Sequence, residues 1–123
     1  MREFTVRMDN RPGMLAALTE EIAEAGINIE AVAAMGINGD GMVRLVVADG
    51  PGTRRVLRKA GISFEERPVL TTLLTHEPGD LARMARRLAD AATNIEAIYL
   101  LHSTAAGLEF AVGIDDPDAS LDE

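Results

Sequence analysis

The chain has 123 residues, a net charge of −8 and 47% hydrophobic residues, which fits a folded protein of one ordinary domain or two very small ones. The acidic balance disfavours nucleic-acid binding through a broad basic surface, and the absence of cysteine excludes disulfides, thiolate metal sites and cysteine nucleophiles. No apolar run is long enough to span a bilayer, and a patterned segment begins directly after Met1. We therefore expect a soluble, cytoplasmic protein with no signal peptide.

The first half of the sequence predicts one unit with the order strand, helix, strand, strand, helix, strand. In chain order we expect a strand at residues 4–8, a helix at 12–25, strands at 27–37 and 42–48, a helix at 51–60 and a strand at 62–67. Pro12 suits the first turn of its helix, and Gly26 suits the left-handed position beyond its end. Asn38-Gly39-Asp40-Gly41 is a hairpin signal. This order predicts an α+β, ferredoxin-like βαββαβ fold, with both helices on one face of an antiparallel sheet.

The sequence repeats itself with an offset of 66 residues. Pro12-Gly13 recurs as Pro78-Gly79, and Asn28–Ala31 recurs as Asn94–Ala97. Aligned without gaps, residues 11–49 and 77–115 share 13 identities in 39 positions, including Gly41 with Gly107. A repeat of this kind indicates two copies of one structural unit. We therefore predict two tandem modules, module 1 (residues 1–67) and module 2 (residues 68–123).

Module 2 is predicted to be a shortened copy. We expect a strand at residues 69–75, a helix at 78–91, and strands at 95–103 and 108–114. The sequence ends inside the second helix of this copy, so most of that helix and the last strand are expected to be absent. The uncovered sheet edge would favour pairing with the other copy or with another chain. The stretch 62–75 is expected to form one nearly continuous strand shared by the modules.

Three features are expected to converge at one end of each module. The loop Asp9–Gly13 leads into a helix whose free N–H groups attract an anion. Gly13 permits a close approach, and Asn28 at the start of the next strand can both donate and accept hydrogen bonds. Together they would suit a ligand that carries a carboxylate and an ammonium group. From the residues alone, the alternative is that Pro12-Gly13 forms a turn and Asn28 caps a bend.

The segments Asn10–Leu15 and Ile22–Ile29 closely resemble the ACT domain signature, and Glu77–Leu81 with Asn94-Ile95 is a looser match. The resemblance covers essentially the whole chain as two tandem modules. It implies ferredoxin-like regulatory modules that bind amino acids at interfaces between paired modules and are usually fused to metabolic enzymes. Because no catalytic domain accompanies the modules in this sequence, we expect a free-standing, non-enzymatic protein with no cofactor and no metal. A small amino acid effector, a homodimer and a metabolic enzyme are the partners that the resemblance implies.

The resemblance also implies the ligand contacts, residue by residue. In module 1 they fall on Asn10, Arg11, Pro12, Gly13, Met14, Leu15, Asn28 and Ile29, and in module 2 on His76, Glu77, Gly79, Asp80, Leu81, Asn94 and Ile95. In the serine-binding ACT domains of phosphoglycerate dehydrogenase, two asparagines hold the effector, and these correspond to Asn10 and Asn28. Met8 replaces a histidine of that motif, which argues against serine itself. His76 stands in place of Asn10, so the two half-sites are expected to differ chemically.

Two other classes of function remain open at this point. An oligomerisation or protein-interaction module without a small ligand is motivated by the shortened second copy. An enzyme is the third class, because ferredoxin-like acylphosphatases share the fold. Those enzymes use an arginine in a phosphate-binding loop, and Arg11 is only a distant counterpart. We therefore predict no catalytic residues.

Overall fold

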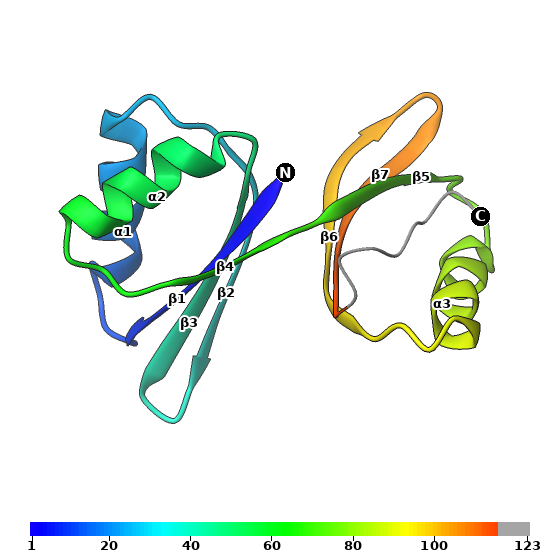
Figure 1. The fold of residues 1–123 in the computed structure, drawn as a ribbon, viewed down its shortest axis with the longest axis horizontal. Helices are drawn as coiled ribbons and strands as arrows, with labels where there is room; N and C mark the ends of the chain where they lie inside the picture. Colours follow the sequence, from blue (N-terminus) through cyan, green and yellow to red (C-terminus); the bar gives the residue numbers. More distant parts are fainter. Residues whose placement is uncertain (116–123) are drawn as a thin grey trace. The chain divides into compact units, whose positions relative to one another are not determined.

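The computed structural model describes residues 1–115, and the chain divides into two compact units, Met1–Arg67 and Pro68–Glu123, with the bounds of modules 1 and 2 (Figure 1). Module 1 contains β1 (Arg2–Asp9), α1 (Met14–Glu24), β2 (Ile29–Ile37), β3 (Asp40–Val47), α2 (Gly50–Lys59) and β4 (Glu65–Pro68). Module 2 contains β5 (Leu70–Leu74), α3 (Asp80–Asp90), β6 (Ile95–Thr104) and β7 (Gly107–Ile114). The predicted βαββαβ order is confirmed, and each element ends within three residues of its predicted bounds.

The sheet of module 1 has the strand order β2-β3-β1-β4, and α1 and α2 lie on the same side of it (Figure 1). Alternate residues of β1 and β3 face these helices, as the period of a strand requires. The core formed in this way consists of Phe4, Val6, Leu18, Ile22, Ile27, Val43, Leu45, Val47 and Leu57. Burying one such side chain contributes about 1.5–3 kcal/mol. The two layers of module 1 are therefore held together mainly by this apolar interface.

The sheet of module 2 has the strand order β5-β7-β6, with α3 packed against it. Its core consists of Leu74, Met84, Leu88, Val112 and Ile114. β5 is an edge strand within the described residues, whereas its counterpart β1 lies between two other strands. The predicted stub of a second helix would fall in residues 116–123, outside the described residues.

Glycine, rather than proline, sets the start of α1. We predicted Pro12 in the first helical turn, but the helix begins at Met14 and Gly13 takes the N-cap position with φ 89°. Gly79 does the same before α3 with φ 90°. A residue with a side chain adopts this left-handed conformation only at a cost. The repeated glycine is thus explained by the helix start alone.

The predicted continuous strand over residues 62–75 is wrong. β4 ends at Pro68, Val69 lies outside any strand, and β5 belongs to the other sheet. Proline has no N–H to donate to a strand ladder, so it favours a strand end at this position.

The hairpin turn of module 1 is confirmed and shorter than predicted. Asn38 and Gly39 have φ values of 52° and 85°, and Ile37 pairs directly with Asp40. Positive φ at both central residues is the signature of a type I′ turn, which matches the twist of the flanking strands. A two-residue turn fixes the register of β2 against β3 and therefore decides which residues face each other near the site.

The gapless alignment of the two modules fails within β6. This strand has the same irregularity near its start as β2, and a second one between Leu100 and His102. Phe4 pairs with Leu45, whereas its counterpart Leu70 pairs with Val112, which lies 67 rather than 66 residues after Leu45. The structural counterpart of Gly41 is therefore Leu108 and not Gly107, as the sequence alignment suggested.

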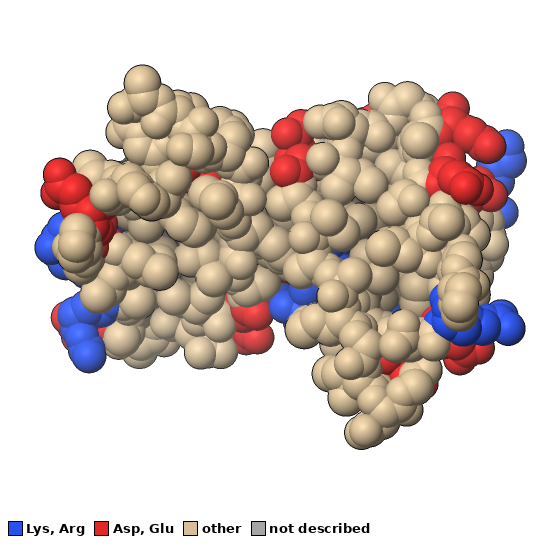
Figure 2. All heavy atoms as spheres, turned by 180° about the vertical axis from the view of Figure 1, so that it is seen from behind, with Lys and Arg blue, Asp and Glu red and all other residues tan. Residues whose placement is uncertain are grey.

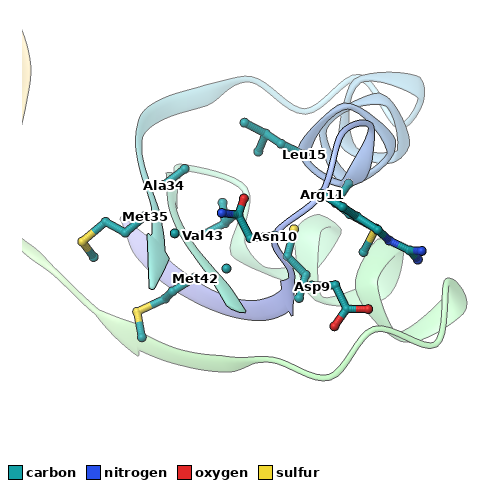
Figure 3. Close-up of a pocket in the computed structure, with 12 residues that line it drawn as sticks. Asp9, Asn10, Arg11, Leu15, Ala34, Met35, Met42 and Val43 are labelled. Atoms are coloured by element: carbon teal, nitrogen blue, oxygen red, sulfur yellow. The ribbon is translucent and has the colours of Figure 1, made fainter. Parts of the chain in front are cut away.

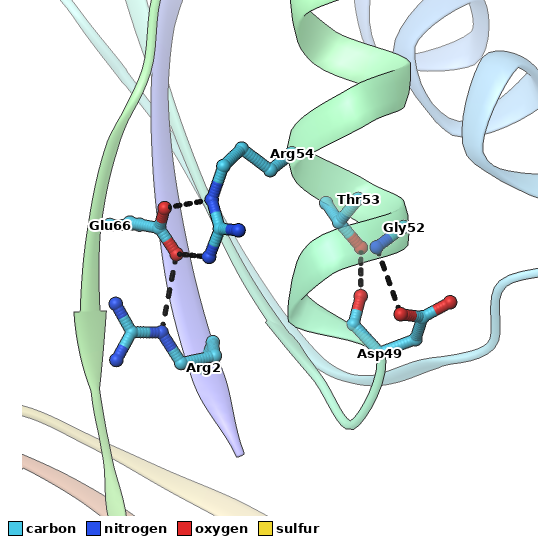
Figure 4. A network of polar contacts seen from close by, with 6 residues as sticks. All are labelled: Arg2, Asp49, Gly52, Thr53, Arg54 and Glu66. Carbon is cyan, nitrogen blue, oxygen red and sulfur yellow. Dashed lines mark hydrogen bonds and ion pairs between the residues drawn. The ribbon is translucent and has the colours of Figure 1, made fainter.

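A polar network joins β4, β1 and α2 on the helical side of module 1 (Figure 4). The Glu66 carboxylate accepts hydrogen bonds from Nε and Nη2 of Arg54 and from Nε of Arg2, the last over 3.2 Å. The hydrogen bond from Arg54 is the main reason that the pKa of Glu66 lies below its ordinary value. Nearby, the Asp49 carboxylate accepts from the Gly52 N–H over 2.9 Å and caps α2 (Figure 4).

The surface charges are mixed on the face that Figure 2 shows. Acidic and basic side chains lie in small neighbouring groups there, and much of this face carries no charged side chain. In the part of the chain that the structure describes, no helix is long and apolar enough to cross a membrane.

Candidate functional site

A pocket of about 170 Å³ opens in module 1 where the loop after β1 enters α1, beside the hairpin of β2 and β3 (Figure 3). It is lined by Met8, Asp9, Asn10, Arg11, Met14, Leu15, Ala34, Met35, Gly36, Gly41, Met42 and Val43. This volume is below the usual range for enzyme and drug sites, so within one module the pocket suits a small metabolite.

The Asn10 side chain points into this pocket, between α1 and β2 (Figure 3). Its backbone N–H donates to the carbonyl of Gly39 over 2.9 Å, which ties the loop to the hairpin. Gly36 and Gly41 face each other across β2 and β3, and a Cβ atom on Gly36 would collide with Nδ2 of Asn10. A Cβ atom on Gly41 would lie 3.2 Å from the backbone oxygen of Met8. Gly36 thus makes the room that the Asn10 amide occupies, and Gly41 lets β3 lie close to the backbone of Met8.

The start of α1 has features that favour an anion. No side chain caps this end of the helix, and its first turn contains no acidic residue. The positive end of a helix dipole attracts negative charge. The side chains of Arg11 and Asp9 point away from Asn10 in Figure 3, so both lie at the margin of the pocket rather than inside it.

Module 2 has a pocket at the corresponding place, with different chemistry. It measures about 500 Å³ and is lined by Leu74, Thr75, His76, Glu77, Pro78, Leu81, Leu108 and Phe110. Ser103 and Leu108 face each other where module 1 has its two glycines. His76, which takes the place of Asn10, therefore has no glycine cradle of the kind found in module 1.

The first turn of α3 carries a carboxylate, which does not cap the helix. Oδ2 of Asp80 accepts from the backbone N–H of Thr75 over 2.6 Å and from the Thr75 hydroxyl over 2.9 Å. Its Oδ1 accepts from Nη2 of Arg83 over 3.2 Å. The hydrogen bonds from Thr75 are the main reason that the pKa of Asp80 lies below its ordinary value, so this group stays charged at neutral pH. Met14 takes the same position at the start of α1.

Asn28 and Ile29 lie far from the pocket, and the predicted convergence at one end of module 1 is wrong. Asn28 precedes β2, whose first residue aligns through β3 with Arg2 at the start of β1, whereas Asn10 follows the end of β1. A strand rises about 3.3 Å per residue, so the length of β1 separates the two asparagines by roughly 20 Å. The helix α1 returns the chain to the opposite end of the sheet before β2 begins.

The Asn-Ile-Glu repeat has a structural role in both modules. Nδ2 of Asn28 donates to Oε1 of Glu30 over 3.3 Å, and Nδ2 of Asn94 donates to Oε1 of Glu96 over 3.2 Å. Each bond spans the irregularity at the start of its strand. An irregularity of this kind leaves one residue out of the regular ladder, here Glu30 and Glu96, which are the acceptors of these two bonds. The repeat is therefore explained at least by a shared fold feature, the irregularity at the start of β2 and β6.

The structure brings together half of the predicted contacts in module 1 and fewer in module 2. Asn10, Arg11, Met14 and Leu15 line the first pocket, and His76, Glu77 and Leu81 line the second. The residues that do not line either pocket are Pro12, Gly13, Asn28, Ile29, Gly79, Asp80, Asn94 and Ile95.

Sequence reasoning missed the floor and far wall of the first pocket. Ala34, Gly36, Gly41 and Val43 come from β2 and β3 and line it opposite α1. A usable signal was present, because a two-residue turn at Asn38-Gly39 places Gly36 opposite Gly41. Across the described residues, no three His, Asp or Glu side chains gather as a metal ion would require.

Comparison with known proteins identifies the family of module 1. Residues 3–61 match the ACT domain family. Protein BT0572 from Bacteroides thetaiotaomicron has a similar structure, with a TM-score of 0.83 and 20% identity over 95% of this chain and 81% of that chain. The regulatory subunit of aspartate kinase from Thermus thermophilus, in its ligand-free form, has a TM-score of 0.64 and 17% identity over 92% of this chain and 80% of that chain.

The aspartokinase alpha and beta subunits are similar as well, with a TM-score of 0.63 and 22% identity over 93% of this chain and 81% of that chain. No curated protein sequence matches the chain. At these identities the solved structures show a shared fold, which extends through both modules. Module 1 is therefore an ACT domain, and module 2 repeats the first four elements of the same fold within the described residues.

Proposed function

We propose that this protein is a non-enzymatic regulator that binds a free amino acid in the pocket of module 1. The observation that carries the proposal is the Asn10 amide, which is held in the pocket beside the uncapped start of α1. A free amino acid presents a carboxylate and an ammonium group on adjacent atoms. The carboxylate would lie at the N–H groups of the helix start, and the Asn10 amide oxygen would accept from the ammonium group.

Module 2 supports the proposal by contrast. The Asp80 carboxylate lies at the start of α3 and would repel the carboxylate of a second amino acid. The cradle of glycines that holds Asn10 is replaced by Ser103 and Leu108. We therefore propose one effector per chain, bound in module 1.

The proposal includes a homodimer and an enzyme as partner. Asn28 and Ile29 could contact an effector only if another module presented them, because they lie at the far end of their own sheet. The edge strand β2 has exposed apolar side chains at Val32, Met35 and Ile37, which a second chain would cover. Similar folds occur in regulatory subunits of aspartate kinase, which makes a metabolic enzyme a reasonable target of regulation.

A thermal-shift screen of the full chain against the twenty amino acids tests this function. An amino acid at 100 times its dissociation constant adds about 2.7 kcal/mol to stability. We expect one chemical class of amino acid to raise the melting temperature and the Asn10→Ala variant to lose the effect. His76→Ala is the matched control, since His76 takes the corresponding place in module 2, and it should keep the effect.

Two results would contradict the proposal. If no amino acid at millimolar concentration stabilises the folded protein, it is not an amino acid sensor. If Asn10→Ala binds as well as the unchanged chain, the pocket of module 1 is not the site.

An interaction module without a small ligand is the second candidate. Exposed apolar residues lie on edge strands of both sheets, at Val32 and Ile37 of β2 and at Ile98 and Leu100 of β6. Large exposed apolar groups on an edge strand favour association. Light scattering after size exclusion would support this function if a stable assembly formed without any amino acid, and a strict monomer would argue against it.

A further inference from the structure

We infer that the amino acid bound in module 1 carries an uncharged aliphatic side chain. This inference rests on the proposed function, because it concerns the same pocket. It goes further in naming the chemical class of the effector and the residues that select it.

The side chains that line the pocket outside the Asn10 loop are apolar. Leu15 and Met14 line it from α1, and Ala34 and Val43 line it from β2 and β3. Figure 3 shows Leu15 and Ala34 on the same side of Asn10, close to the tip of its amide. An effector held at its backbone by the start of α1 and by Asn10 would therefore extend its side chain against these apolar groups.

No charged group points inward to pair with a charged effector side chain. Arg11 and Asp9 line the pocket, but their side chains point away from Asn10 (Figure 3). A lysine or aspartate side chain placed against Leu15 and Ala34 would lose water without gaining an opposite charge. Burying an unpaired charge is strongly unfavourable, and burying an unpaired amide is unfavourable to a lesser degree.

The size of the pocket is also consistent with an aliphatic effector side chain. Its volume is about 170 Å³. For comparison, a dry apolar cavity of about 150 Å³ in another protein accommodates benzene. The pocket therefore has room for a branched or linear aliphatic side chain. Gly36 and Gly41 face each other at its floor and carry no side chains, although the Asn10 amide takes the space beside Gly36.

Calorimetric titration of the full chain with L-leucine and L-asparagine tests the inference. The two side chains have nearly the same shape and differ in polarity, so the pair separates shape from chemistry. We expect leucine to bind at least about tenfold more tightly than asparagine, because the amide of asparagine would lie against Leu15 and Ala34 without hydrogen-bond partners. L-Lysine and L-serine complete the panel and should bind more weakly than leucine.

Leu15→Ser tests whether Leu15 determines the preference for leucine over asparagine. Leu15 is 41% exposed, so its replacement should leave the fold intact, which circular dichroism would verify. We expect this variant to lose most of the preference for leucine over asparagine. Leu81→Ser is the matched control, because Leu81 takes the corresponding position on α3 and is 50% exposed. It should keep the preference.

The outcomes separate the inference from the proposed function. If asparagine, serine or lysine binds more tightly than leucine, the inference is overturned, but the proposed function of an amino acid sensor stands. Equal loss of preference in Leu15→Ser and Leu81→Ser would also overturn it. Absence of binding by every amino acid would overturn the proposed function. A last outcome is that the unchanged chain is a dimer that does not bind leucine and that Leu15→Ser dissociates it. This would show that a second copy covers Leu15, and it would also overturn the inference.

Discussion

The two modules share a fold but differ at most of the positions that shape the pocket, Leu15 and Leu81 being an exception. Where module 1 has Asn10, Met14 and the facing pair Gly36 and Gly41, module 2 has His76, Asp80 and the facing pair Ser103 and Leu108. Neither helix start is capped by a side chain, but the first turn of α3 carries the Asp80 carboxylate and the first turn of α1 carries no acidic residue. The comparison teaches that a repeated fold can place pockets at corresponding positions while a few side chains change their size and chemistry.

The largest expected effect concerns the helix α2, which completes the core of module 1. Leu57 of α2 is fully buried in that core. Leu57→Ala should lower the free energy of unfolding by about 2–5 kcal/mol, because a cavity would replace a packed side chain. Urea denaturation followed by circular dichroism measures this, with the exposed Leu81→Ala as control. A loss below about 1 kcal/mol would mean that α2 is not seated on the sheet as described.

Gly36→Ala should separate binding from folding. The added methyl group would collide with the Asn10 amide, which can rotate away at little cost to stability. We expect effector affinity to fall by about tenfold or more, equivalent to about 1.4 kcal/mol, with an unchanged melting temperature of the free protein. Ser103→Ala, at the corresponding position of β6, should leave affinity unchanged. Equal affinities for both variants would show that the glycine pair does not serve the site.

A pair of backbone variants compares the helix ends. Gly26 follows α1 with φ 74°, and its counterpart Ala92 follows α3 with φ 55°. Because a Cβ atom disfavours this conformation, Gly26→Ala should destabilise the protein by about 1 kcal/mol and Ala92→Gly should stabilise it by up to about as much. Thermal denaturation of the two variants checks the opposite signs. A shift of the melting temperature in the same direction for both variants would contradict the left-handed conformation of Gly26 and Ala92.

The smallest effect depends on pH and concerns the network around Glu66. The folded pKa of Glu66 lies below its unfolded value, so its charged form stabilises module 1 above the unfolded pKa. This stability is lost as the pH falls through the lower, folded pKa. Denaturation of Glu66→Gln should therefore show a deficit relative to the unchanged chain at neutral pH that disappears in acid. A deficit independent of pH would show that the charge of Glu66 is not responsible.

The sequence predicted the bounds of the helices and strands better than it predicted which of their residues lie close together. Periodic apolar residues and the turn at Asn38-Gly39 placed the helices and strands of both modules to within three residues. The predicted position of Asn28 close to Asn10 was wrong. The two residues belong to one sequence motif, but α1 lies between them and carries the chain to the opposite end of the sheet. The one-residue shift in β6 was missed, because a bulge leaves no local composition signal and appears only in the strand register.

The most direct test of the central claim is an NMR titration of the isotope-labelled full chain with the amino acid that gives the largest thermal shift. We predict chemical-shift changes at the amides of residues 10, 11, 13–15, 34–36 and 41–43, with one amino acid bound per chain. Changes centred on residues 74–81 instead, or an absence of changes at saturating concentration, would contradict the assignment of an amino acid site to module 1.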